Sequence, residues 1–366
     1  MLCILLNIAP SYREGIYKEI DKSWKTEWYF GDNKTDIHGM DTSILSQVTL
    51  LQNSNVYGNW YWQKGALELA KSKKYSVYVI TGEPYCLSTW ILALCLRVFY
   101  PKKRFYFWTH GWYGKETKSV AFVKKIFFKL AHGIFLYGNY AKKLMTSEGF
   151  NSEKLFVIHN SLNYKKQVQI RQSIKPSDIY HNHFGNRNPV IIFIGRLTSV
   201  KKLDLLIEAV KLLNQEKVQV NIVLVGEGEE HTKLTELVHQ NRLDNRVWFY
   251  GACYDEKKNA ELLYNADICV APGNVGLTAI HSMTFGTPVI SHNDFKWQMP
   301  EFEAIRPGQT GDFFEKDDIQ SLKRVISNWL NIHQNRNEVR NKCFKEIDLH
   351  WTPEFQMNVL KKNLDL

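Results

Sequence analysis

Short apolar runs alternate with longer amphipathic stretches along the first half of the chain. The runs have lengths typical of buried strands and lie at residues 2–8, 76–81, 104–109, 133–137 and 155–158. Helix-length stretches separate them, for example residues 62–73 and 139–148. Because strands that alternate with helices form parallel sheets with helices on both faces, the pattern predicts an α/β fold.

The second half repeats this pattern after a polar interruption. Residues 166–188 are rich in Lys, Gln, Asn and His and lack an apolar period, which indicates a linker. Further strand-like runs follow at residues 190–194, 218–225, 247–250, 268–270 and 288–291. A length of 366 residues fits two domains. We therefore predict two parallel-sheet α/β domains, at residues 1–165 and 189–345.

Composition narrows the class of protein. Hydrophobic residues make up 44% and charged residues 23%, which disfavours a disordered or fibrous chain. The apolar run at residues 86–96 falls short of the ~20 residues that a membrane-spanning helix needs. Residues 1–9 lack the basic leader and cleavage site of a signal peptide, so we expect a buried strand there. The six cysteines form no C-x-x-C pair, which indicates a reducing cytoplasm rather than disulfides or a zinc site.

Positive charge is concentrated in residues 101–130, which hold eight basic residues and one acidic residue, hence +7, among many aromatic residues. At helical spacing, three lysines share one stripe, Lys118, Lys125 and Lys129. An apolar stripe runs beside it, formed by Phe122, Ile126 and Leu130. Such a surface suits an anionic membrane, which we favour over nucleic acid; an ordinary solvated helix face is the alternative.

Glycines follow three strand-like runs of the second half, at Gly195, Gly226 and Gly251. A glycine past the carboxyl end of a strand lets the backbone approach a ligand closely, and open α/β sheets bind ligands at that edge. The first of these turns also carries Arg196 and Lys201, a pair of cations suited to a diphosphate. The alternative for these cations is a salt bridge at the start of the following helix.

A second glycine-rich turn lies in residues 271–283. Gly276, Leu277 and Thr278 lead into a predicted helix, whose free amides form an anion site. Two sites for negative charge at one sheet edge are what a nucleotide diphosphate needs. A tight strand-to-helix turn would explain the glycines but not the paired basic residues.

These motifs resemble the donor domain of GT-B glycosyltransferases of family four. The matching segments of the second half are Phe193-Ile194-Gly195-Arg196-Leu197 with Lys201, Val225-Gly226-Glu227-Gly228, Val247-Trp248-Phe249-Tyr250-Gly251, Ala266-Asp267-Ile268, Gly276-Leu277 and Gly286-Thr287-Pro288. In the first half, Thr109-His110-Gly111 is similar to the strand-end histidine of the family. Residues 351–364 resemble the helix that crosses back onto the first domain, and we expect residues 346–366 to form this C-terminal segment.

The resemblance implies two Rossmann-like domains with a nucleotide sugar in the cleft between them. It places His110 opposite the donor sugar as a catalytic residue, together with Arg196 and Lys201. It implies nucleotide and diphosphate binding by a wider set, Gly195, Arg196, Lys201, Gly226, Gly276, Leu277, Thr278 and His281.

The chain departs from the family pattern at one motif. Two glutamates eight positions apart usually flank the Gly-Leu pair, but Gly273 and His281 stand at those positions. An imidazole still exchanges hydrogen bonds with a ribose hydroxyl, and Asn274 is our candidate for a donor-sugar contact. A helix-capping role for Asn274 is the alternative.

Together these features predict a glycosyltransferase that uses a nucleotide-diphosphate sugar. By resemblance, it retains anomeric configuration and requires no metal or other cofactor. We expect a saccharide acceptor, lipid-linked and used in surface polysaccharide biosynthesis, at the cytoplasmic face of the membrane. Lys118, Lys125 and Lys129 would face the acceptor and lipid. Two alternatives stay open: a non-catalytic subunit that binds nucleotide sugars, and a nucleotide-sugar epimerase.

Overall fold

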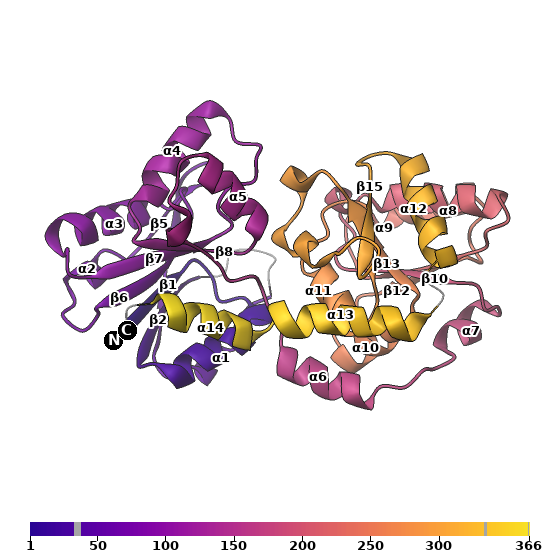
Figure 1. Cartoon of the computed structure of the whole chain (residues 1–366), viewed down its shortest axis with the longest axis horizontal. Helices are drawn as coiled ribbons and strands as arrows, with labels where there is room; N and C mark the ends of the chain where they lie inside the picture. Colours follow the sequence, from indigo (N-terminus) through magenta and orange to yellow (C-terminus); the bar gives the residue numbers. More distant parts are fainter. Residues whose placement is uncertain (33–37, 333–334, 365) are drawn as a thin grey trace. The chain divides into compact units, whose positions relative to one another are not determined.

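The computed structural model describes residues 1–32, 38–332, 335–364 and 366, which form two compact units (Figure 1). The first unit comprises Met1–Asn163 and Trp351–Leu366, and the second comprises Tyr164–His350. Each unit is built on one large sheet in which all neighbouring strands run parallel. The prediction of two parallel-sheet α/β domains is therefore confirmed.

The first unit contains a seven-stranded sheet in the order β3-β2-β1-β6-β7-β8-β9. Its strands are β1 (Leu2–Leu6), β2 (Thr26–Gly31), β3 (Val48–Leu51), β6 (Val77–Thr81), β7 (Arg104–Thr109), β8 (Gly133–Leu136) and β9 (Leu155–Val157). All five strand-like runs of the first half lie in this sheet. Strands β2 and β3, which sequence analysis did not predict, extend it on one side.

Helices cover both faces of this sheet (Figure 1). Because successive strand residues point to opposite faces, Phe105 and Phe107 of β7 join one hydrophobic cluster and Tyr106 and Trp108 join the other. The first cluster includes α2 (Glu68–Lys71), α3 (Leu87–Phe99), α4 (Lys118–Lys129) and α5 (Asn139–Ser147), and the second includes α1 (Glu14–Ser23) and α14 (Pro353–Asn363).

The expectation of a helix at residues 62–73 is wrong. The structure has an antiparallel hairpin of β4 (Asn53–Tyr57) and β5 (Trp60–Gln63), and then the short α2. Adjacent aromatic residues at Trp60, Tyr61 and Trp62 favour extended backbone. Gly58, at a φ of 53°, makes the turn between the two strands.

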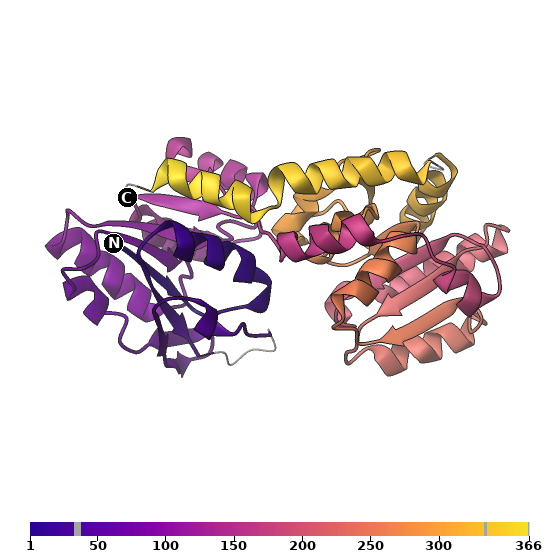
Figure 2. The same ribbon diagram turned by 90° about the horizontal axis from the view of Figure 1, so that it is seen from below.

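Helix α14 packs beside α1 (Figures 1 and 2). Thr352 caps it by accepting a hydrogen bond from the Phe355 amide, and Pro353 occupies its first turn, where proline needs no amide partner. The expected start of this segment at residue 346 is wrong. Residues 346–350 continue α13 (Arg336–His350) of the second unit, and the helix ends only where the capping sequence begins.

The second unit contains a six-stranded sheet in the order β12-β11-β10-β13-β14-β15. Its strands are β10 (Val190–Ile194), β11 (Asn221–Val225), β12 (Val247–Gly251), β13 (Ile268–Ala271), β14 (Val289–His292) and β15 (Gly311–Phe314). Besides α13, its main helices are α8 (Leu203–Gln215), α9 (His231–Gln240), α10 (Glu256–Asn265), α11 (Thr278–Thr284) and α12 (Ile319–Ile332).

The linker predicted at residues 166–188 is instead part of the second unit. It holds α6 (Tyr164–Ser173) and α7 (Ile179–Phe184). Each helix buries few side chains, which is why no apolar period marks them in the sequence. Tyr180 fixes α7 because its hydroxyl donates to the Leu262 carbonyl oxygen at 2.6 Å.

In the part of the chain that the structure describes, no helix has both the length and the apolarity needed to cross a membrane.

Candidate functional site

The loops after β10, β11 and β13 lie against one another at the carboxyl edge of the second sheet. A Cβ atom at Gly226 would lie 1.9 Å from the Gly195 carbonyl oxygen, and one at Gly273 would lie 1.9 Å from that of Val200. Gly226 also has a φ of 144°, which side chains disfavour. This close backbone packing accounts for glycine, rather than a carboxylate, at position 273.

Lys201 and Asn274 meet at this edge. The Lys201 ammonium donates to the Asn274 carbonyl oxygen at 2.8 Å and to its Oδ1 at 2.7 Å. Burial lowers the pKa of Lys201 to about 8; the nearby charge of Glu301 opposes this shift and that of Arg196 adds to it. The structure thus brings three predicted residues into one charged neighbourhood and adds Glu301.

The predicted anion-binding turn begins helix α11. The Thr278 hydroxyl donates to the carbonyl oxygen of Ile194 at 2.8 Å, which ties the start of α11 to the end of β10. Gly276 adopts a φ of 53° in this turn, and Leu277 accepts the first helical hydrogen bond from the His281 amide at 2.9 Å. The turn therefore holds its backbone beside the Gly195 loop, as a diphosphate site requires.

His281 has a partner that the sequence did not suggest. Its Nε2 lies 3.1 Å from Oε1 of Glu256, at the start of α10. The same Glu256 oxygen accepts a hydrogen bond from Gln167 at 2.8 Å. Burial raises the pKa of Glu256, but these two partners outweigh it and leave the pKa below the usual value. A carboxylate thus stands beside position 281 although the chain position itself lacks one.

A second carboxylate, Glu301, lies at the start of the 3-10 helix η6 (Pro300–Ala304) and is only 2% exposed. Sequence analysis gave Glu301 no role. Glu256 carried no local signal, because its relation to His281 arises from tertiary packing, in which α6 contacts both α10 and α11.

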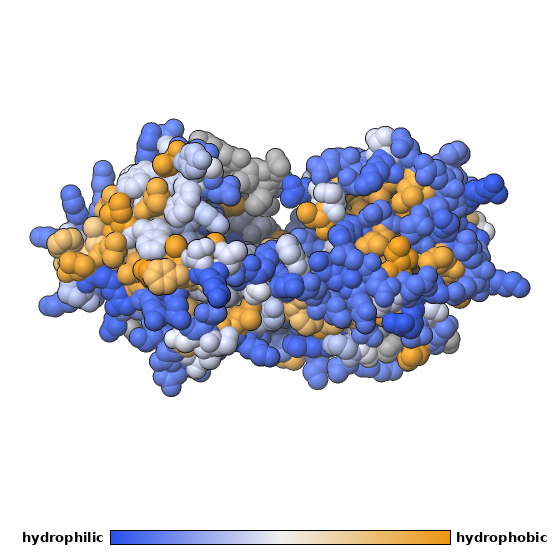
Figure 3. Space-filling view, turned by 90° about the horizontal axis from the view of Figure 1, so that it is seen from above, coloured by the Kyte–Doolittle hydropathy of each residue, from blue (hydrophilic) through white to orange (hydrophobic). Residues whose placement is uncertain are grey.

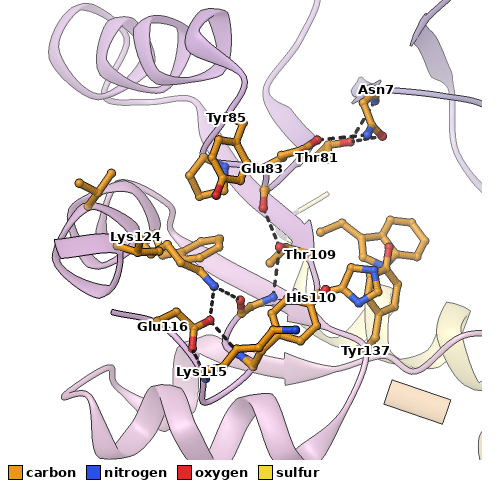
Figure 4. A pocket seen from close by; sticks show the side chains of 18 of the residues that line it. Asn7, Thr81, Glu83, Tyr85, Thr109, His110, Lys115, Glu116, Lys124 and Tyr137 are labelled. Atoms are coloured by element: carbon orange, nitrogen blue, oxygen red, sulfur yellow. Dashed lines mark hydrogen bonds and ion pairs between the residues drawn. The ribbon is translucent and has the colours of Figure 1, made fainter. Parts of the chain in front are cut away.

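The first unit contains a cavity of about 800 Å³ at the carboxyl ends of β1, β6, β7 and β8 (Figure 4). Charged side chains and aromatic rings alternate around its wall. The residues that define it best are Asn7, Tyr12, Arg13, Trp60, Glu83, Tyr85, Trp108, His110, Tyr113, Lys115, Glu116, Lys124 and Tyr137. The mixture of rings and hydrogen-bonding groups suits a saccharide.

His110 follows β7 and lies in this cavity beside Tyr137, with ring centroids 4.7 Å apart (Figure 4). Burial lowers the pKa of His110 to about 3, and the charges of Arg13 and Lys124 act in the same direction. The imidazole is therefore neutral at pH 7. Its Nδ1 is buried and has no hydrogen-bond partner among the described residues.

An ion pair forms the opposite wall. The Lys124 ammonium lies 2.6 Å from Oε1 of Glu116 and donates to the Gly111 carbonyl oxygen at 2.7 Å (Figure 4). Glu116 also accepts hydrogen bonds from the amides of Tyr113 and Gly114. Burial raises the pKa of Glu116, but these partners lower it overall, which keeps the carboxylate charged.

The predicted membrane-facing lysines lie on α4. Lys118 and Lys129 are exposed, and Lys125 lies 4.0 Å from Glu148. Between them Phe122 is 64% exposed. Exposed apolar side chains on α4 and the adjacent α3 form what we call the α3–α4 face: Ile91, Leu94, Val98, Phe99, Val120, Phe122, Val123 and Ile126. Apolar side chains gather on the first unit in Figure 3.

Among the described residues, no group of three or more His, Cys, Asp or Glu side chains is placed to hold a metal ion. The residues predicted for donor binding and catalysis fall into three places: Arg196, Lys201 and Asn274 with the glycine loops, His281 with Glu256, and His110 in the cavity of the first unit.

A two-unit architecture of parallel sheets with a glycine-lined carboxyl edge defines the GT-B class of fold. Residues 175–346 match the family model of glycosyl transferases group 1. This match covers most of the second unit, Tyr164–His350.

Two curated proteins are similar to parts of this chain. An uncharacterised 41.2 kDa protein in the cps region of Klebsiella pneumoniae is 23% identical over 264 residues, 71% of this chain and 63% of that protein. An uncharacterised glycosyltransferase of Methanocaldococcus jannaschii is 28% identical over 151 residues, 38% of this chain and 36% of that protein. The chain thus spans less than two thirds of these curated relatives.

Two solved structures share the fold over nearly the whole chain. Anabaena HepE in complex with UDP gives a TM-score of 0.74 at 16% identity and covers 99% of both chains. The apo form of WaaB, a lipopolysaccharide outer core galactosyltransferase, gives 0.70 at 14% identity and covers 100% of both.

Proposed function

We propose that the protein transfers a sugar from a nucleotide-diphosphate sugar to a saccharide acceptor, with retention of anomeric configuration and without a metal. The observation that carries this proposal is the meeting of Lys201, Arg196 and Asn274 beside the glycine loops of the second sheet. A related fold is known in complex with UDP and with UDP-glucose, which supports a nucleotide sugar as the donor.

Bond cleavage leaves negative charge on the departing diphosphate. A lysine already held by Asn274 stabilises that charge without reorganisation, and the Arg196 guanidinium adds a second contact. The amides at the start of α11 complete the cradle. We assign His281, with Glu256 behind it, to the ribose, because an imidazole held by a carboxylate presents a fixed hydrogen-bonding edge.

His110 acts on the sugar side of the reaction. Its imidazole is neutral at pH 7, so it offers one donor and one acceptor and adds no charge to the site. A neutral ring positions a sugar hydroxyl without attracting the diphosphate away from Lys201. In this scheme His110 contributes to the rate more than to nucleotide affinity.

The acceptor is a lipid-linked saccharide of surface polysaccharide synthesis, reached at the cytoplasmic face of an anionic membrane. The cavity of the first unit opens beside α4, whose residues Ser119, Val120 and Val123 contribute to its lining. The same helix carries the exposed lysines and the α3–α4 face. The cps-region relative and the lipopolysaccharide galactosyltransferase support this class of acceptor.

The decisive experiment incubates the protein with nucleotide sugars and measures the products. Slow release of free nucleotide diphosphate supports the transferase, a new nucleotide sugar indicates an epimerase, and binding without turnover indicates a non-catalytic subunit. The two missing family glutamates motivate that last alternative.

Two substitutions test the donor site directly. Lys201→Ala and Arg196→Ala should each remove about 2–4 kcal/mol of transition-state stabilisation, a loss of roughly 30- to 1,000-fold in rate. Lys202→Ala is the matched control, because this neighbouring lysine pairs with Asp317 instead. Near-normal rates in both variants contradict the assignment of the donor site.

A further inference from the structure

One end of the cavity in the first unit holds buried N–H groups without acceptors. The Nε of Arg13 and the Nε1 of Trp108 have no hydrogen-bond partner among the residues that the structure describes. Both side chains line the cavity. A buried donor without an acceptor costs about 1–3 kcal/mol, so each such group calls for an explanation.

Arg13 also brings a charge that no carboxylate balances within the described parts of the chain. It donates to the Tyr137 hydroxyl, and the buried Tyr17 hydroxyl also lies beside it. Its guanidinium carbon lies 5.4 Å from the centroid of the Trp108 ring and 5.0 Å from that of the Tyr137 ring. Aromatic faces stabilise a cation, but they accept no N–H hydrogen bond in the guanidinium plane. The phenol hydroxyls around Arg13 are neutral, so the guanidinium keeps its full positive charge.

The carboxylates of the cavity are already engaged. Glu83 accepts hydrogen bonds from Tyr61 at 2.9 Å and from Asn7 at 3.2 Å. Glu116 is held by Lys124 and by backbone amides. Neither of them forms an ion pair with Arg13 in the described structure, so the Arg13 end of the cavity presents donors and positive charge together.

We propose that this cavity binds an acidic saccharide, whose carboxylate or phosphate oxygens accept hydrogen bonds from Arg13 and Trp108. An oxyanion has several lone pairs and satisfies both N–H groups at once, and guanidinium–oxyanion pairs are among the stronger hydrogen-bonded contacts. The rings of Trp60, Tyr85 and Tyr113 then pack against the sugar body. The proposal rests on the proposed transferase function and specifies its acceptor as anionic.

Binding of small saccharides to the whole chain, without a nucleotide sugar, tests this proposal. Calorimetry at constant ionic strength compares glucuronate, glucose 6-phosphate and glucose. We expect one or both acidic sugars to bind at least tenfold more tightly than glucose. Preference for glucuronate identifies a carboxylate ligand, and preference for glucose 6-phosphate identifies a phosphate. Equal affinity for all three sugars, or absence of binding by both acidic sugars, overturns the proposal.

Variants assign the binding to Arg13. Arg13→Gln should weaken the acidic sugar at least tenfold, while Lys22→Gln removes the same charge from an exposed position of α1 and should not. If Arg13→Gln lowers the melting temperature markedly, Trp108→Phe replaces it, since this change removes one N–H and keeps a ring. An acidic sugar that binds both variants like wild type overturns the proposal.

The diphosphate of the donor is another anion that this cavity could bind, and competition with UDP distinguishes it from an acidic acceptor. If UDP displaces the acidic sugar, and Arg13→Gln weakens the binding of UDP as much as that of the sugar, the site binds the donor diphosphate and the proposal is wrong. Acidic-sugar binding without nucleotide release from any donor would leave this inference standing and refute the transferase function.

Discussion

At the scale of single residues, the chemistry depends on groups whose environment changes their charge. Lys201 is buried enough to bring its pKa to about 8, and His110 is buried enough to stay neutral. Sequence analysis identified both residues because each of them follows a strand-like run. Their charge states follow from burial and from neighbours distant in sequence, which no local motif encodes.

Nucleotide affinity should fall at high pH because of Lys201. Below pH 8 the Lys201 ammonium is already charged. Above pH 8 the lysine must take up a proton when the anion binds, so the Kd of UDP should rise up to tenfold per pH unit. The nucleotide phosphate itself titrates near pH ~6, outside this window. Lys201→Arg keeps a charge throughout and should give a flat profile between pH 7 and 9.5. A wild-type profile that is equally flat would show that Lys201 does not contact the anion.

His110→Ala should lower kcat on the order of 100-fold while changing the Kd of the nucleotide little. The reason is that its neutral imidazole contributes hydrogen bonds on the sugar side and no charge to the diphosphate. Steady-state kinetics and nucleotide titration measure the two effects, with the exposed His239→Ala as control. Equal losses in both, with a lowered melting temperature, would instead indicate a structural role for this buried ring.

At the scale of elements, α4 combines two roles on two faces. Phe127 and Phe128 anchor it in the hydrophobic core of the first unit, while its exposed side carries the lysines and part of the α3–α4 face. Sequence analysis could predict a basic stripe from helical spacing, because that spacing is local, and residues 118–129 do form a helix. The exposed apolar surface of α3 beside it could not be predicted, because it depends on which helices become neighbours.

Changing Lys118, Lys125 and Lys129 together to Glu should abolish binding to anionic vesicles. Each lysine near such a surface contributes ~1 kcal/mol, and the substitution turns attraction into repulsion. The control changes Lys71, Lys73 and Lys74 to Glu, which alters the net charge equally at exposed positions outside α4. Co-sedimentation at low and high salt measures the effect, which should weaken as salt screens the charges. Wild type that ignores anionic vesicles at low salt would refute membrane docking.

At the scale of the whole molecule, sequence alone gave both parallel sheets and the resemblance to the GT-B class. It missed α6, α7 and the β4–β5 hairpin, because weakly amphipathic helices and short aromatic strands lack a clear period. It also missed Arg13, Glu256 and Glu301. These residues acquire partners only through tertiary packing; Arg13, for example, bonds a tyrosine 124 positions away.

Both units should lose stability between pH 6.5 and 5, because each holds a histidine that is kept neutral by its surroundings. The pKa of His132 is lowered to about 4 and that of His292 to about 4, in each case chiefly by burial. Each Nδ1 accepts a backbone hydrogen bond, from Phe105 and Asp294 respectively. Their unfolded pKa is about 6.5, so below that pH the unfolded chain takes up protons that the folded chain does not, and the melting temperature falls.

Replacing either of these histidines with glutamine should make the melting temperature less dependent on pH. Calorimetry measures the melting temperatures of His132→Gln and His292→Gln as a function of pH, with the exposed His239→Gln as control. The measurements stay above the pH range in which carboxylates titrate. Identical slopes in all variants would show that other groups govern the acid response.

The contribution of residues 351–366 to the first unit has a consequence for biosynthesis. Met357, Leu360 and Leu364 complete a core whose remaining members lie before residue 159. At about 5–20 residues per second, the ribosome spends roughly 10–40 s on the intervening Tyr164–His350 segment. During that interval the nascent first unit exposes the apolar groove that α14 later fills. Chaperones that recognise apolar surface can therefore bind this groove during a defined interval, which ends when α14 has been synthesised and packs into the groove.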